Sequence, residues 1–300
     1  MSKRTNYVTM EFLETAPLPD QTVSYTVIPH KRVNDKVEAE LLSKGFDIEK
    51  TIFRANAGAQ IASGTVLLKQ GDNEMRMMFT WANSYDKSMK FKCAIGGYLP
   101  QSESIMISGN MGSWGRKHTG SADTEMEKTI QDQLLMADTY YKSLVEDKEI
   151  MKEITIESDT RASALGILFF EHGVLTGEQM GIIKQEIRKP SFVYNGPTNS
   201  LWHMYCHIIF ALQKSHPKKW LDQQRLVHFM LCDMFGVDTA KQSLEATKNA
   251  AMPMEAMAVV SEGTFEGDIL QPKDPAQLDL VDEITKAEGQ KQEYDITKEE

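Results

Sequence analysis

The chain has 300 residues, of which 41% are hydrophobic and 25% are charged, and its formal net charge is −10. This composition is typical of a globular protein that can bury a core. No apolar run approaches the roughly 20 residues that a membrane span needs, and the N-terminal segment MSKRTNYVTMEFLE has no apolar stretch behind its basic residues. We therefore expect neither a membrane span nor a secretory signal.

The negative charge is concentrated at the C-terminal end. Residues 251–300 hold 13 acidic and four basic residues, which leaves 30 acidic and 29 basic residues in the rest of the chain. A nearly neutral body can still carry a local basic patch, so nucleic acid is not excluded as a partner. The terminal segment has three prolines and no apolar periodicity, which predicts an acidic disordered tail over residues 251–300.

Strand-like alternation runs through the first third of the chain, and turn-like separators such as Asn56-Ala-Gly58 divide it. One helix is expected among the strands, over residues 33–44, with Gly45 at its C-cap position. The candidate strands are residues 7–11, 23–28, 48–54, 61–68, 74–81, 88–98 and 104–108.

Helical periodicity replaces this alternation from about Ser121. One apolar face runs from Met126 to Leu144 and predicts a single long helix. Thr176 and Gln179 form a capping-box pattern at the start of a later helix. Further helices are expected over residues 161–172, 176–189, 201–214 and 219–235.

These patterns predict an α+β fold, with an N-terminal, mostly antiparallel sheet of about six to seven strands and one helix, followed by a C-terminal helical half. We expect residues 1–250 to form one domain, strand-rich over residues 1–115 and helical over residues 121–240. The three cysteines, Cys93, Cys206 and Cys232, are odd in number and far apart, which argues against a disulfide framework and favours the cytoplasm.

Three segments together resemble a known family in their order and spacing. They read WANSYDKSMKF over residues 81–91, RKHT over residues 116–119, and LWHMY over residues 201–205 after a Pro-Thr-Asn loop. They resemble the DUF932 family of phage and plasmid proteins, a domain of unknown function, over about residues 20–235. Family members read Cys-Asp-Asn or Cys-Thr-Asn near the end of the last strand, where this chain reads Ile107-Ser-Gly-Asn110. The resemblance thus implies a mobile-element setting and no catalytic thiol at that point.

A basic segment and a glycine-rich loop form the main candidate site. Along the strand over residues 88–98, lysines alternate with apolar residues, so the lysines share the opposite face. The loop GNMGSWGRKH over residues 109–118 combines glycines that let backbone N–H groups approach a phosphate, cations that neutralise it, and an aromatic ring that can stack on a base. A solvated basic turn is the alternative interpretation. The residues predicted to bind nucleic acid are Lys87, Lys90, Lys92, Trp114, Arg116, Lys117 and His118.

Two other patterns carry weaker hypotheses. Asn83, Ser84, Tyr85 and Asp86 form either a structural turn or a motif of unknown role. His203 and His207 lie one helical turn apart, but they are predicted to face away from the apolar stripe and no third ligand is evident. We therefore expect no metal site, no cofactor and no catalytic residues.

Two functions remain open. The first is a non-enzymatic DNA-binding protein of a phage or plasmid, acting on single strands in recombination or replication as a homo-oligomer. The second is a protein-interaction factor whose acidic tail or surface engages a host or phage protein, for instance to inhibit a host defence system. The two differ in whether the predicted basic residues lie on one face.

Overall fold

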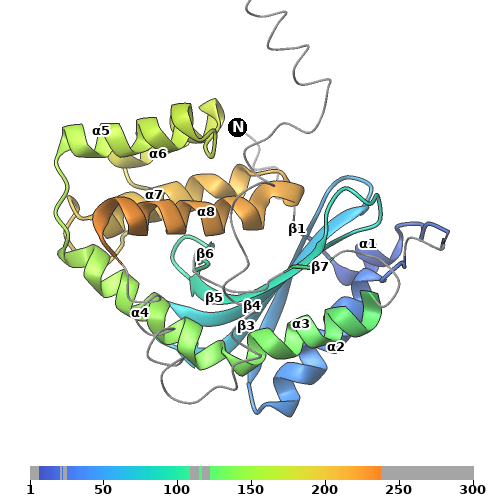
Figure 1. The fold of residues 1–300 in the computed structure, drawn as a ribbon. Helices are drawn as coiled ribbons and strands as arrows, with labels where there is room; N and C mark the ends of the chain where they lie inside the picture. The colour runs from blue at the N-terminus through green and yellow to red at the C-terminus, as the bar shows by residue number, and fades with distance from the viewer. Residues whose placement is uncertain (1–6, 21, 23–25, 109–114, 117–121, 238–300) are drawn as a thin grey trace, which may run out of the picture. The chain divides into compact units, whose positions relative to one another are not determined.

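The computed structural model describes residues 7–20, 22, 26–108, 115–116 and 122–237, and it confirms the α+β class (Figure 1). The sheet comes first in the chain and the helices follow. Among the described residues, no helix is both long and apolar enough to cross a membrane. The acidic segment 251–300 lies outside the described residues, so the predicted tail and domain boundary remain predictions.

The sheet is an antiparallel meander in the order β1-β2-β3-β4-β5-β6, and β7 pairs with β5 beside the path. Each strand therefore pairs with the next one along the chain. The strands are β1 (Tyr7–Val8), β2 (Ile48–Ala55), β3 (Ile61–Gly71), β4 (Arg76–Ser84), β5 (Phe91–Leu99), β6 (Ser104–Met106) and β7 (Gly115–Arg116).

Helices contact both faces of the sheet (Figure 1). Helices α2 and α3 pack on one face, α8 packs on the other, and α6 lies against α7. The helices are α1 (Met10–Glu14), α2 (His30–Ser43), α3 (Ala122–Leu135), α4 (Ala137–Glu153), α5 (Ser158–Gly166), α6 (Gly177–Arg188), α7 (Leu201–Ala211) and α8 (Pro217–Phe235).

This double coverage buries the central strands on both faces, so that every described side chain of β5 except Lys92 is buried. On the α2 side, Trp81 Nε1 donates to Asn34 Oδ1 at 3.3 Å. The indole lies against Gly64 of the neighbouring strand, where an added Cβ would come within 2.4 Å of the ring. Gly64 is therefore required by the close approach of Trp81, because any larger residue would displace the ring.

The apolar core has two parts. One lies around the sheet, α2 and α3 and includes Trp220 at the start of α8. The other is formed mainly by α4 to α8 and includes Met75, Leu99 and Met106 from the strands. The sheet residues in the second cluster join the helical half to the strands.

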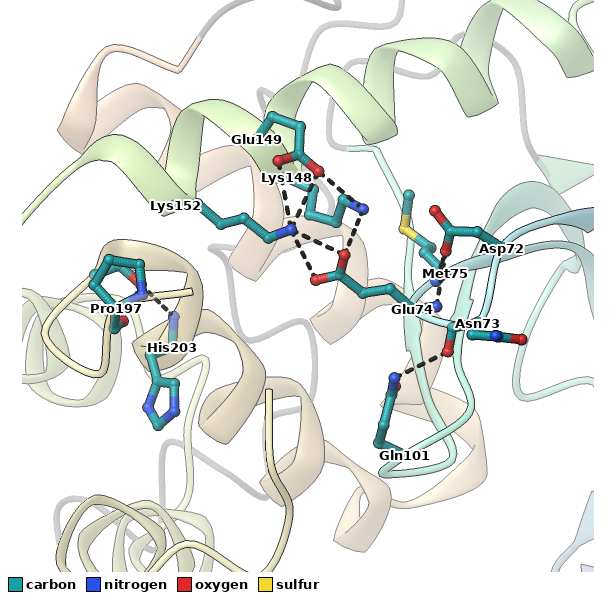
Figure 2. Close-up of polar contacts among 11 residues, drawn as sticks. Asp72, Asn73, Glu74, Met75, Gln101, Lys148, Glu149, Lys152, Pro197 and His203 are labelled. Atoms are coloured by element: carbon teal, nitrogen blue, oxygen red, sulfur yellow. Dashed lines mark hydrogen bonds and ion pairs between the residues drawn. The ribbon is translucent and has the colours of Figure 1, made fainter. Parts of the chain in front are cut away.

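An ion-pair network ties the turn between β3 and β4 to α4 (Figure 2). Lys148 is 2% exposed, and its Nζ lies 3.0 Å from Glu74 Oε2, while Lys152 Nζ lies 2.8 Å from Glu74 Oε1. Glu149 contacts both lysines. Since a buried ammonium requires paired charges, this network fixes α4 against the hairpin tip.

Several element boundaries differ from the sequence predictions. Strand β1 ends at Val8, and Thr9 caps α1 by accepting a hydrogen bond from Phe12 N, so most of the expected strand over residues 7–11 is wrong. Residues 26–28 form no strand. The long helix expected from Met126 to Leu144 is interrupted at Met136 and divides into α3 and α4. The capping box of Thr176 and Gln179 is confirmed.

Candidate nucleic-acid interface

The segment Asn83-Ser84-Tyr85, at the end of β4, is a buried scaffold rather than an exposed turn. Asn83 Nδ2 donates to Ile28 O at 2.8 Å and lies 3.0 Å from His30 Nδ1. His30 N donates to Tyr85 Oη at 2.7 Å, and the two rings stack with centroids 3.9 Å apart. Asn83, Ser84 and Tyr85 are all buried. These contacts fasten the segment before α2 to the end of β4.

The two ring nitrogens of His30 contact different partners. Its Nδ1 faces the Asn83 amide donor, and its Nε2 lies 2.9 Å from the carbonyl oxygen of Ala59. Nδ1 must therefore accept and Nε2 must donate, which places the proton on Nε2. This buried histidine stabilises the scaffold on which the following turn is built.

The turn after this scaffold presents two of the predicted lysines. Asp86 Oδ1 accepts a hydrogen bond from Ser88 N at 2.9 Å, which is an Asx-type turn. Lys87 takes the left-handed conformation, with φ of 62°. Lys87 and Lys90 are exposed. A turn was expected to include Asn83 and Ser84, but these two residues belong to β4, and the turn is formed by Asp86 to Ser88.

Strand β7 brings the glycine-rich loop back to this turn. Arg116 pairs with Phe91, and Gly115 pairs with Lys92, in antiparallel register. The backbone of the RKHT segment therefore begins beside the lysine-bearing end of β5. Trp114, Lys117 and His118 lie outside the described residues, so their predicted roles remain predictions.

Lys92 faces helix α8 and is paired. Its Nζ lies 2.5 Å from Asp222 Oδ2, and its side chain is 14% exposed. Its neighbours Phe91 and Cys93 are buried on the opposite face, so the predicted alternation holds. Since Asp222 offsets its charge, Lys92 contributes less to an anion site than the sequence suggested.

The first turn of α8 adds two cations that the sequence analysis missed. Lys218 and Lys219 are exposed, and His216 caps the helix by accepting from Lys218 N at 3.2 Å. The pKa of the Asp86 carboxyl is lowered. Burial by itself would raise this pKa, but hydrogen bonds from Ser88 and Ser84 and the positive charge of Lys218 lower it by more. The basic pair directly after Pro217, at a helix start, was the available signal.

The aromatic side chain of Trp220 packs beneath the start of α8. Trp220 is buried, and the Arg54 guanidinium lies 4.6 Å from the centre of its ring and 4.8 Å from that of Tyr7. Such contacts are cation–π interactions. We call the four exposed lysines of the turn after β4 and the first turn of α8, Lys87, Lys90, Lys218 and Lys219, the basic surface.

His203 and His207 are buried, so the prediction that they face outward is wrong. Helix α7 is enclosed along its length, and the two side chains are 7% and 2% exposed. His207 Nε2 lies 3.1 Å from His203 Nδ1, and Tyr194 packs edge-on against both rings. Burial, His203 and Arg161 lower the pKa of His207 to about 4. The pair is thus part of a buried, uncharged packing arrangement.

Comparison with protein-family models, curated proteins and solved structures finds no match to this chain.

Proposed function

We propose that this chain binds single-stranded nucleic acid through the basic surface and does not catalyse a reaction on it. One observation supports this most directly. The turn after β4 and the start of α8 are far apart in sequence but are linked through the ion pair between Lys92, at the start of β5, and Asp222 of α8. Both segments carry lysines that are exposed to solvent, and the positive charge of such side chains attracts phosphates.

The start of α8 favours an anion for a second reason. The N-terminus of a 19-residue helix carries a partial positive charge and N–H groups without intrahelical partners. Phosphate oxygens suit such a position. The resemblance to the DUF932 family supports a phage or plasmid setting, in which such a protein would act in the host cytoplasm during recombination or replication, as a homo-oligomer.

Binding of fluorescent single- and double-stranded oligonucleotides by the full-length chain tests the proposal. We expect tighter binding of the single strand, because unpaired bases can stack on Trp114. Trp114→Ala should cost roughly 1–3 kcal/mol in binding. Deletion after Ala250 should strengthen binding at low salt, because it removes a segment with a net charge of −9.

The Lys218→Ala/Lys219→Ala double variant should weaken binding of all sequences alike. Lys184→Ala/Lys189→Ala is its matched control, because those two lysines are also exposed but belong to α6 and the residue that follows it. Equal effects of the two double variants would argue against a localised basic surface. A protein-interaction factor would bind neither oligonucleotide.

A further inference from the structure

A buried cluster of three metal-binding side chain types lies between α4 and α8. Asp147 comes from α4, while His228 and Cys232 are one turn apart on α8. Their exposed fractions are 1%, 1% and 6%. One ligand atom from each residue lies within 4.8 Å of the other two. This cluster is separate from the basic surface, and the proposed function does not use it.

Two of the three distances between ligand atoms are close to the edges of a tetrahedral zinc site. Zinc binds nitrogen and oxygen at about 2.0–2.2 Å and sulfur at about 2.3 Å. In a tetrahedral site, a nitrogen ligand therefore lies about 3.4 Å from an oxygen ligand and about 3.6 Å from a sulfur ligand. His228 Nε2 lies 3.4 Å from Asp147 Oδ2 and 3.7 Å from Cys232 Sγ. Because Sγ is equally far from both ring nitrogens, the His228 ring or the Cys232 side chain must rotate before one ion can contact both Nε2 and Sγ.

Tyr205 of α7 packs beside the cluster. Its side chain is fully buried, and its hydroxyl has no hydrogen-bond partner among the described residues. The ring packs edge-on against His228 with centroids 5.9 Å apart. A buried hydroxyl without a partner is costly, and an ion or its bound water would satisfy it.

We propose that Asp147, His228 and Cys232 bind one zinc ion. A thiolate, a carboxylate and a neutral imidazole balance the charge of Zn²⁺, so the occupied site is electrically neutral and suits burial. Burial of all three ligands matches a structural site that joins α4 to α8.

Two other chemistries are alternatives for the cluster. In the first, no metal binds: burial lowers the pKa of His228, but Cys232 and Asp147 outweigh it and raise the pKa to about 10, which favours a charged imidazolium between them. The cobalt titration separates this arrangement from a zinc site. A thiol nucleophile would need an exposed sulfur hydrogen-bonded to one ring nitrogen. Cys232 is buried, and its Sγ is 3.7 Å from both nitrogens of His228. The geometry thus favours metal binding over nucleophilic catalysis.

Cobalt substitution of the full-length chain tests the zinc site. The protein is stripped with a chelator, titrated with Co²⁺, and then back-titrated with Zn²⁺. We expect one Co²⁺ per chain, visible bands of tetrahedral intensity, a thiolate-to-cobalt band in the near ultraviolet, and loss of all bands on adding Zn²⁺. Cys232→Ser should abolish the thiolate band, and His228→Gln should abolish stoichiometric binding.

Cys206→Ser and His203→Gln are matched controls, because both residues are buried on α7 outside the cluster. Both variants should retain the full cobalt spectrum. A thiolate band that persists in Cys232→Ser, or a wild-type chain that shows no band, would overturn the proposal. If the variants do not fold, the melting temperature of the wild-type chain with and without zinc still tests whether the site binds zinc. It should rise by about 5–10 °C at a hundredfold excess of zinc over its Kd, and no rise together with no cobalt band refutes the site.

Discussion

Lys92 of β5 and Asp222 of α8 form an ion pair, with 2.5 Å between Nζ and Oδ2, at the place where the helix crosses the sheet. The pair links the turn after β4 to the first turn of α8. It also reduces the positive charge that the basic surface offers to a phosphate.

Asp222→Asn should strengthen binding of single-stranded DNA several-fold at low salt, because it removes a negative charge beside Lys92 and Lys218. The free energy of unfolding should change by less than about 1 kcal/mol, since the pair is partly exposed. Asp233→Asn is the control, because Asp233 is exposed near the opposite end of α8. Equal gains for both variants would mean that only total charge matters.

Lys148→Ala should destabilise the fold more than Lys152→Ala. Lys148 is 2% exposed and Lys152 is 15% exposed, and both pair with Glu74 (Figure 2). Breaking a buried pair costs about 3 kcal/mol, whereas the more exposed pair should contribute about 1 kcal/mol. Urea unfolding of the two variants measures the difference. Equal losses would show that the hairpin tip does not depend on the buried ammonium.

The buried pair of His203 and His207 should make the protein acid-sensitive. Burial, His203 and Arg161 lower the pKa of His207 to about 4, whereas the unfolded chain takes up a proton near 6.5. Between these values the unfolded state binds more protons than the folded state, so stability falls as pH falls. The full difference corresponds to about 3 kcal/mol. His207→Gln should flatten the loss of stability between pH 6.5 and 4, as measured by urea unfolding. A slope identical to that of the wild-type chain would contradict the assignment.

Local signals predicted much of the fold. The capping box of Thr176 and Gln179 and the left-handed Gly45 after α2 depend on neighbouring residues, and both are confirmed. The prediction for His203 and His207 was wrong because a helical wheel shows one apolar stripe, while α7 is enclosed on every side by other elements. Tertiary packing decided their burial, and no local pattern reports it.

The candidate sites depended even more on long-range packing. The lysines of the turn after β4 were found from their own segment, but Lys218 joins them only because α8 crosses the sheet. Asp147 is likewise distant in sequence from His228 and Cys232, and α4 must pack on α8 before the three meet. Spacing within one helix predicts pairs of ligands, whereas the third ligand comes from the fold.

The salt dependence of single-stranded DNA binding tests the central claim most directly. The association constant of the full-length chain is measured from about 50 to 200 mM salt, beside the Lys87→Ala/Lys218→Ala/Lys219→Ala triple variant. Each phosphate contact contributes a slope of about 0.7 in log K against log salt for single strands. We predict a linear fall for the wild-type chain and a slope smaller by about 2 for the triple variant. No binding at about 50 mM salt, or an unchanged slope in the triple variant, would contradict nucleic-acid binding through the basic surface.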